Sequence, residues 1–208
     1  MKNLFYLFLL SLSLSACHAE KVPFIPAGAT VVVLGDSLSY GTGAEKNEDY
    51  PSILATDTGW NIVNAGVPGD TAADGLERLP GLLEANKPKL LIIELGGNDF
   101  LHGVPVGQTI SNLKAIIAQA KLKNITPLLV AIPAFSPLKA AIGGLSDHPL
   151  YEEMAEETKT LLIEDTFSDV LSNNTLKADY IHPNAQGYRK VEEKMRESLT
   201  ELGLLQAK

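Results

Sequence analysis

A serine and a histidine that lie far apart in the sequence could together carry out nucleophilic catalysis. Ser37 lies in residues 35–39 (Gly-Asp-Ser-Leu-Ser), directly after an apolar run, and His182 lies in residues 179–183 (Asp-Tyr-Ile-His-Pro). Asp179 can fold back onto one nitrogen of the His182 ring and leave the other nitrogen free as a base. A nucleophile, a base and an orienting carboxylate are the components of an acyl-transfer site. Taken singly, a serine at such a turn is more commonly a helix cap and a loop histidine a solvated residue.

Two further segments could supply hydrogen-bond donors to the oxyanion that forms during acyl transfer. Gly66 lies in residues 65–71, and a glycine lets the backbone approach a ligand and turn its N–H toward it. Asn98 lies in residues 96–99 (Gly-Gly-Asn-Asp) and could aim its side-chain amide at the same point. Both residue types also favour simple turns. The joint occurrence of nucleophile, base, carboxylate and donors predicts acyl transfer.

The elements that must position these residues alternate along the chain. Short apolar runs predict strands at residues 30–34, 61–64, 90–94, 128–132 and 160–163. Two stretches carry apolar residues at helical spacing: Ile110, Leu113, Ile117 and Ala120 in one, and Tyr188, Val191, Met195 and Leu199, followed by Gly203 as a stop, in the other. Strands separated by helices predict a three-layer α/β/α sandwich with a five-stranded parallel sheet. Ligands of such open sheets bind beyond the carboxyl ends of the strands, where the chemically active residues lie.

Composition narrows the classes of function. The chain has 208 residues, of which 45% are hydrophobic, and this is enough for one ordinary domain. Its net charge of −8 makes it a poor candidate for binding nucleic acid. The single cysteine excludes an intrachain disulfide and a cysteine-rich zinc site. Asp36, Asp70 and Asp99 could be metal ligands, but they lack the spacing of known sites, so we expect no metal and no cofactor.

The first residues predict an export signal. Lys2 precedes an apolar run that is too short to span a bilayer, so residues 1–16 read as a signal peptide. Residues 14–17 (Leu-Ser-Ala-Cys) resemble the cleavage box of bacterial lipoproteins, which predicts a lipid on Cys17, a lipidated tether at residues 17–28 and a catalytic domain at residues 29–208. We therefore expect the domain in the bacterial cell envelope, in the periplasm or at the outer membrane. The alternative is ordinary secretion, with cleavage after Ala16 or Ala19.

The four chemically active segments resemble the blocks of the GDSL/SGNH hydrolase superfamily. Residues 35–38, Gly66, residues 96–99 and residues 179–183 match its blocks in order. The resemblance implies a flavodoxin-like fold, a catalytic triad of Ser37, His182 and Asp179, and an oxyanion hole formed by Ser37, Gly66 and Asn98. Residues 69–71, 75–76, 78–80, 82–83 and 94–99 are similar to the subgroup of bacterial thioesterases/lysophospholipases and arylesterases.

We therefore expect a serine esterase that acts on lysophospholipids, on short- to medium-chain acyl or aryl esters, and on thioesters, as a monomer. One alternative is a carbohydrate O-acetyl esterase acting on envelope glycans, and another is a non-catalytic envelope lipoprotein. Residues 39–50 and 133–150 depart from the subgroup, and such loops commonly set substrate preference. Phe100 and Leu101 could line an acyl pocket, although core packing is commoner for such residues. His102 and His148 are expected at the surface.

Overall fold

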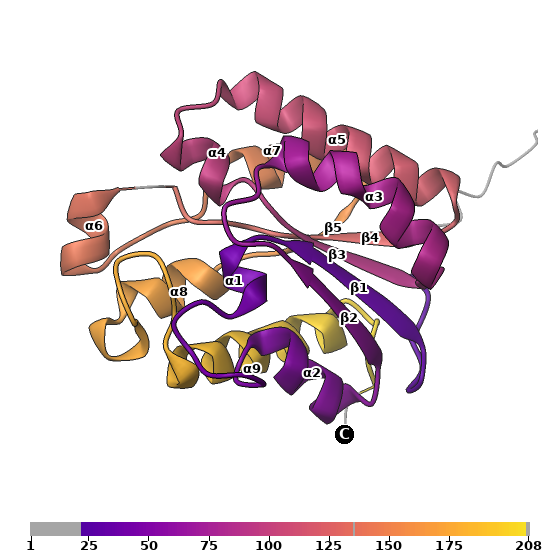
Figure 1. Cartoon of the computed structure of the whole chain (residues 1–208), viewed down its shortest axis with the longest axis horizontal. Helices are drawn as coiled ribbons and strands as arrows, with labels where there is room; N and C mark the ends of the chain where they lie inside the picture. The colour runs from indigo at the N-terminus through magenta and orange to yellow at the C-terminus, as the bar shows by residue number, and fades with distance from the viewer. Residues whose placement is uncertain (1–21, 135, 207–208) are drawn as a thin grey trace, which may run out of the picture.

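The computed structural model describes residues 22–134 and 136–206 and has one parallel β-sheet at its centre (Figure 1). Its strands are β1 (Thr30–Gly35), β2 (Asn61–Gly66), β3 (Leu90–Glu94), β4 (Thr126–Val130) and β5 (Leu161–Ile163). All neighbouring strands are parallel, and their order is β2-β1-β3-β4-β5. This is the flavodoxin-like order, so the predicted fold class is confirmed.

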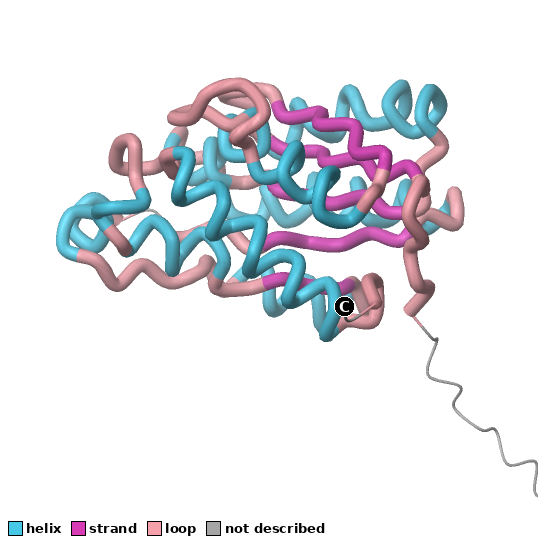
Figure 2. Tube along the Cα trace, turned by 90° about the horizontal axis from the view of Figure 1, so that it is seen from below, coloured by secondary structure: helices cyan, strands magenta, loops and turns pink. Residues whose placement is uncertain are grey.

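Helices cover both faces of the sheet. They are α1 (Ser37–Tyr40), α2 (Tyr50–Thr58), α3 (Ala72–Asn86), α4 (Gly97–Leu101), α5 (Val106–Leu122), α6 (Pro137–Ile142), α7 (Leu150–Thr158), α8 (Thr166–Ser172) and α9 (Ala185–Glu201), with a short 3₁₀ helix η1 (Asn174–Leu176). Helices α3, α5 and α7 lie on one side of the sheet, and α2, α8 and α9 lie on the other (Figure 1). The view from below shows the strands between these helices (Figure 2). Helix α6 extends past the carboxyl ends of the strands (Figure 1).

The apolar runs form strands because the sheet is buried between these layers. Residues 31–34 of β1 and residues 90–93 of β3 are fully buried, as expected for central strands that are covered on both faces. Strand β2 lies at the edge and is only partly buried. The predicted helical stripes are also found on α5 and α9, where Tyr188, Val191, Met195 and Leu199 are fully buried. Gly203 follows the end of α9 with a φ of 77°.

The fourth strand differs from its predicted range. The prediction of residues 128–132 is wrong at both ends, because β4 spans Thr126–Val130. Its last pairing with β5 joins Val130 to Ile163, and the apolar chain then leaves the sheet. Ile132 lies in the loop beyond the strand and lines a cleft there. Hydrophobic periodicity alone could not separate the paired residues from those that continue toward the site.

The start of the described chain is packed onto the domain. Ile25 is 2% exposed, its N–H donates to the Leu204 carbonyl at 3.0 Å, and its carbonyl accepts from the Trp60 ring nitrogen at 3.0 Å. The segment from Ile25 onward, which we expected as part of the tether, is therefore held against the domain. The expected signal peptide and Cys17 lie outside the described residues. Among the described residues, no helix is both long and apolar enough to cross a bilayer.

Candidate active site

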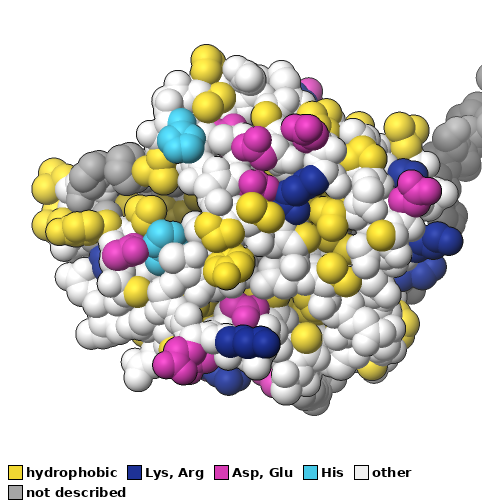
Figure 3. All heavy atoms as spheres, viewed as in Figure 1, with side chains coloured by type: hydrophobic (Ala, Val, Ile, Leu, Met, Phe, Trp, Pro, Cys, Tyr) yellow, Lys and Arg dark blue, Asp and Glu magenta, His cyan; other side chains and the backbone are white. Residues whose placement is uncertain are grey.

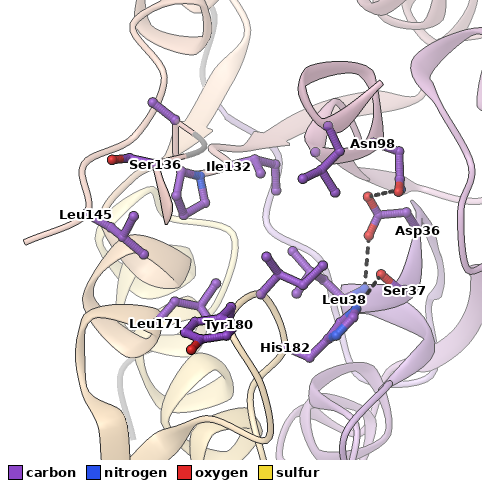
Figure 4. Close-up of a pocket in the computed structure, with 15 residues that line it drawn as sticks. Asp36, Ser37, Leu38, Asn98, Ile132, Ser136, Leu145, Leu171, Tyr180 and His182 are labelled. Atoms are coloured by element: carbon purple, nitrogen blue, oxygen red, sulfur yellow. Dashed lines mark hydrogen bonds between the residues drawn. The ribbon is translucent and has the colours of Figure 1, made fainter. Parts of the chain in front are cut away.

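The chemically active residues gather at the carboxyl edge of the sheet, at the loops that follow β1 and β3. The strand order reverses between β1 and β3, and such a switch point leaves a crevice open to ligands. A cleft lies there with about 570 Å³ of empty space that is open to solvent, and Ser37, Asn98 and His182 are among the residues that line it (Figure 4).

Ser37, His182 and Asp179 form a continuous hydrogen-bonded chain. Ser37 Oγ lies 2.9 Å from His182 Nε2, and His182 Nδ1 lies 2.8 Å from Asp179 Oδ2. Ser37 is the first residue of α1, directly after Asp36, whose side chain caps the helix by accepting from the Leu38 N–H. Asp36 is therefore the cap of this helix, which leaves the Ser37 hydroxyl available to His182.

The loop that carries His182 is shaped by Asp179. Asp179 Oδ1 accepts hydrogen bonds from the backbone N–H groups of Ile181 and His182, each at 2.8 Å. The chain then returns toward α9, with the Ala178 N–H bonded to the His182 carbonyl at 2.9 Å. Pro183 disfavours helical geometry at the preceding residue, which keeps His182 outside the helix. One aspartate thus folds the loop with one oxygen and orients the imidazole with the other.

Charge and hydrogen bonding determine the tautomer of His182. Partial burial raises the pKa of Asp179, but hydrogen bonds from the His182 ring and from the Ile181 and His182 N–H groups outweigh it and hold the pKa below its ordinary value. The carboxylate is therefore ionised at neutral pH and can only accept hydrogen bonds. The proton of the neutral imidazole must lie on Nδ1, so Nε2 has a lone pair directed at the Ser37 hydroxyl.

The expected oxyanion donors differ in their availability. The Ser37 N–H has no hydrogen-bond partner among the described residues. The Gly66 N–H donates to Asn64 Oδ1 at 3.0 Å. The Asn98 amide donates to Asp36 Oδ2 and to the Asp70 carbonyl, each at 3.0 Å. In this state one donor is free and two are bonded within the protein.

Gly66 and Asp36 explain why these loops meet. A Cβ atom on Gly66 would lie 2.4 Å from the Tyr40 nitrogen, so only glycine lets the end of β2 press against α1. Asp36 joins α1 to Asn98 after β3 through its second oxygen (Figure 4).

Burial raises the pKa of Asp36 to about 7. The hydrogen bonds from Leu38 and Asn98 oppose this rise, and the charges of Asp70 and Asp99 add to it. Near neutral pH this carboxyl is thus partly protonated.

The rest of the cleft is mainly apolar. The apolar residues that line it come from three helices and three loops, and they are Leu38, Leu101, Ile132, Pro133, Ala134, Leu145, Leu171 and Ile181. Tyr180 stands at the mouth and is largely exposed. Hydrophobic side chains also protrude over the neighbouring α6, at the left of Figure 3, where Leu138 and Ile142 are exposed. Such a wall suits the hydrocarbon part of an acyl group better than a sugar.

The other side chains singled out in the sequence have structural roles. Asp70 pairs with Arg78 at 2.7 Å, and Asp99 is buried and accepts hydrogen bonds from the Ala72 N–H and the Thr109 hydroxyl. Within residues 22–134 and 136–206, there is no group of three or more His, Cys, Asp or Glu side chains that could hold a metal ion.

Of the residues after β3, Leu101 lines the cleft and His102 is exposed. Phe100 stacks on His148 with ring centroids 4.5 Å apart. His148 is partly exposed rather than fully solvated, because the Phe100 ring covers one face of its imidazole, and burial lowers its pKa.

A buried polar group behind Ser37 was not anticipated. Ser39 Oγ donates to Glu94 Oε2 at 2.6 Å and lies 2.8 Å from the Tyr50 hydroxyl, and all three residues are buried. Arg78, for which the sequence predicted no contact, donates to Asp70 and to the Gly35 carbonyl, the latter at 3.0 Å. The sequence signal for the buried polar group was Glu94, which ends an otherwise apolar strand, because a carboxyl group is rarely fully buried unless it is paired.

Comparisons with known proteins cover the part of the chain that carries this site. Residues 33–190 match the model of the GDSL-like lipase/acylhydrolase family. The chain is 34% identical over 187 residues to the thioesterase 1/protease 1/lysophospholipase L1 of Escherichia coli strain K12, a match that covers 86% of this chain and 83% of that protein. It is 36% identical over 183 residues to the esterase TesA of Pseudomonas aeruginosa, which covers 83% of this chain and 89% of that protein.

Solved structures agree with these sequence matches. A crystal structure of TesA superposes with a TM-score of 0.73 at 31% identity and covers 83% of this chain and 99% of that one. The psychrotrophic esterase EstA from Pseudoalteromonas sp. superposes with a TM-score of 0.72 at 27% identity and covers 83% of this chain and 97% of that one. The similarity covers most of this chain and nearly the full length of the two solved structures.

Proposed function

The chain belongs to the GDSL-like lipase/acylhydrolase family and is an esterase, and we propose that it cleaves carboxylic esters through an acyl-enzyme on Ser37. The observation that carries this proposal is the hydrogen-bonded chain from Ser37 Oγ through the His182 ring to Asp179. It joins a nucleophile, a base and an ionised carboxylate at the end of an apolar cleft. No metal or cofactor is needed for this chemistry.

The first half of the reaction acylates the enzyme. Ser37 Oγ attacks the carbonyl carbon of the ester while His182 Nε2 takes the hydroxyl proton. The tetrahedral intermediate then collapses, the bond between the carbonyl carbon and the leaving oxygen breaks, and His182 gives its proton to the departing alcohol. Asp179 stabilises the positively charged imidazole between these two transfers.

The second half releases the acid. A water molecule gives a proton to His182 and attacks the acyl carbon, and the new intermediate expels Ser37 Oγ, which regains its proton from His182. The oxygen that becomes negative in both halves needs donors at hydrogen-bond distance. The Ser37 N–H is free for this role, whereas the Gly66 N–H and the Asn98 amide must each exchange a present hydrogen bond for the oxyanion.

The cleft supports a lipid or other acyl ester as substrate. Its walls are mostly apolar, as suits the hydrocarbon part of an acyl chain. The names of the relatives point to thioesterase, lysophospholipase and esterase activities, and we extend these substrate classes to this chain as a proposal. A carbohydrate O-acetyl esterase is the alternative, and nothing in the cleft favours it.

We also propose that the enzyme acts in the bacterial cell envelope, anchored by a lipid on Cys17. The support is the sequence of residues 14–17, and Cys17 itself lies outside the described residues. Radiolabelled palmitate fed to cells that express the full chain tests this proposal. We expect incorporation into the wild type and none into Cys17→Ala, and equal incorporation into both would overturn it.

A panel of p-nitrophenyl esters of increasing chain length tests the proposed activity and its substrate. We expect hydrolysis with a kcat/KM optimum at medium-chain esters and its loss in Ser37→Ala. An optimum at acetate, with release of acetate from acetylated glycans, would favour the alternative. Unchanged turnover in Ser37→Ala would contradict the mechanism. An absence of turnover by the wild type would favour the alternative that the protein is a non-catalytic envelope lipoprotein.

A further inference from the structure

A polar group of three side chains lies directly beneath the turn that carries Ser37. Ser39 lies in α1, three residues after the cap Asp36, and its hydroxyl bridges Glu94 Oε2 at 2.6 Å and the Tyr50 hydroxyl at 2.8 Å. All three side chains are fully buried. The backbone N–H groups of Asp36 and Ser39 also face the Glu94 carboxyl group. Groups on both sides of Ser37 are therefore directed at one carboxyl group.

The carboxyl group of Glu94 lies close against the backbone of β1 at Gly35. Gly35 pairs in register with Glu94 across β1 and β3. A Cβ atom on Gly35 would lie 2.1 Å from Ser39 Oγ and 2.7 Å from Glu94 Oε2. The absence of a side chain at Gly35 is what lets Glu94 and Ser39 meet behind the turn.

Glu94 has no positively charged partner among the residues that the structure describes. None of the ion pairs formed by the described residues includes it, and its Oε1 atom has no hydrogen-bond partner among them. The other titratable groups that face it are Asp36 and the tyrosines Tyr50, Tyr151 and Tyr188, and none of them carries a positive charge. An isolated carboxylate in such a place would be very costly, so the group neutralises instead.

We propose that Glu94 is a positioning residue for ester hydrolysis, and that its carboxylic acid, hydrogen-bonded to Ser39, holds residues 36–39 so that Ser37 Oγ meets His182 Nε2. Glu94 acts through Ser39 and does not touch the substrate, because it is absent from the residues that line the cleft. Burial and the nearby Asp36 raise its pKa well above the ordinary value, in agreement with a neutral acid. The inference rests on the proposed role of Ser37.

The location of Glu94 explains why such a role affects the rate rather than substrate affinity. The substrate contacts Ser37 and the apolar cleft, whereas Glu94 fixes the angle at which the Ser37 hydroxyl leaves α1. A displacement of a nucleophile by about 1 Å can cost about 10²-fold in rate. Removal of the hydrogen bond between Glu94 and Ser39 is therefore expected to lower kcat and to leave KM close to the wild-type value.

Three variants test the proposal by steady-state kinetics on a p-nitrophenyl ester. Glu94→Gln keeps the shape and the hydrogen bonding of a neutral acid, Glu94→Leu keeps the volume alone, and Ser39→Ala removes the partner. Glu192→Gln is the matched control, because Glu192 is an equally buried glutamate that pairs with Arg196 on α9, away from the site. Thermal unfolding of each variant is measured alongside, and Ser37→Ala is assayed in parallel.

We expect Glu94→Gln and Glu192→Gln to keep nearly wild-type kcat. We expect Glu94→Leu and Ser39→Ala each to lower kcat by about 10- to 100-fold with KM little changed. The effects of Glu94→Leu and Ser39→Ala are expected to be non-additive in the double variant, because both remove the same bond. If Glu94→Leu does not fold, Ser39→Ala still carries the test.

Two results would overturn the proposal. A Glu94→Gln variant that loses as much kcat as Glu94→Leu would mean that a negative charge is required. Wild-type kcat in Ser39→Ala would mean that the bond to Ser39 does not position Ser37. Turnover that survives in Ser37→Ala would instead contradict the proposed function, so the two failures are distinguishable.

Discussion

Ser37 Oγ and His182 Nε2 lie 2.9 Å apart although 145 positions separate the two residues in the chain. Ser37 directly follows the central strand β1, and His182 lies in the loop that leads into α9. Each is fixed by its own local hydrogen bonds, through Asp36 for one and Asp179 for the other. The contact is therefore a product of the fold and the two loops, and it can be tested one residue at a time.

The orienting role of Asp179 is tested by Asp179→Asn. The asparagine oxygen can still accept the two backbone N–H groups, but its amide would face His182 Nδ1 and favour the wrong tautomer. We expect kcat to fall, by up to about 10⁴-fold where the geometry is retained, with a folded protein. Kinetics with circular dichroism check this, and Asp169→Asn, an exposed aspartate paired with Lys194, is the control. Undiminished kcat in Asp179→Asn would remove Asp179 from the mechanism.

The contribution of Asn98 to oxyanion binding is tested by Asn98→Ala. We expect kcat to fall by about 10²- to 10³-fold, as is typical for the loss of one oxyanion donor, while KM changes little. The amide must release Asp36 or the Asp70 carbonyl before it can bind the oxyanion. Asn86→Ala on α3, whose amide donates to the Leu82 carbonyl, is the control. A change in KM alone would assign Asn98 to substrate binding.

Because Asp36 is buried, we expect the folded protein to become less stable as pH rises. Its pKa rises on folding from the ordinary 3.8 to about 7, chiefly through burial. Between these values the folded state holds one more proton than the unfolded state, so the free energy of unfolding falls as pH rises, by at most about 1.4 kcal/mol per pH unit. Asparagine keeps the helix cap and does not titrate. Urea unfolding across this window is expected to give a flatter slope for Asp36→Asn, and equal slopes would contradict the assignment.

We expect the apolar walls of the cleft to determine which acyl-chain lengths the enzyme accepts. Leu145 lines the cleft in a loop held by the Ser172 hydroxyl, so Leu145→Trp fills space in the cleft. We expect kcat/KM to fall for medium-chain p-nitrophenyl esters and to change little for the acetate. Leu122→Trp, at a position that is 84% exposed at the end of α5, controls for the added indole. An equal loss across all chain lengths would place the acyl group elsewhere.

The general fold was predictable because its signals are local and repeated. Continuous apolar runs at β1 and β3 indicate strands that are covered on both faces, and the spacing on α9 indicates a single buried stripe. From parallel strands alone, the loops that carry Ser37 and Asn98 could be assigned to the same edge of the sheet. The end of β4 could not be predicted from the sequence, because Ala131 and Ile132 are as apolar as the paired residues before them.

The interior of the site was less predictable because it depends on contacts between distant residues. Glu94 stood in the sequence as the last residue of a strand, and only the register with Gly35 brings it to Ser39. The cleft walls at Leu145 and Leu171 come from a loop and a helix without a motif. The bonds that now engage Gly66 and Asn98 likewise depend on side-chain packing that no spacing encodes.

The identity of the nucleophile is tested most directly by covalent labelling with a fluorophosphonate, followed by peptide mapping. The probe reacts with a serine whose hydroxyl is activated by a neighbouring base. We predict one label per chain on Ser37, no label in Ser37→Ala, and strongly slowed labelling in His182→Ala with its fold intact. A label on another residue, or equal labelling of the wild type and Ser37→Ala, would contradict the assignment of Ser37 as the nucleophile.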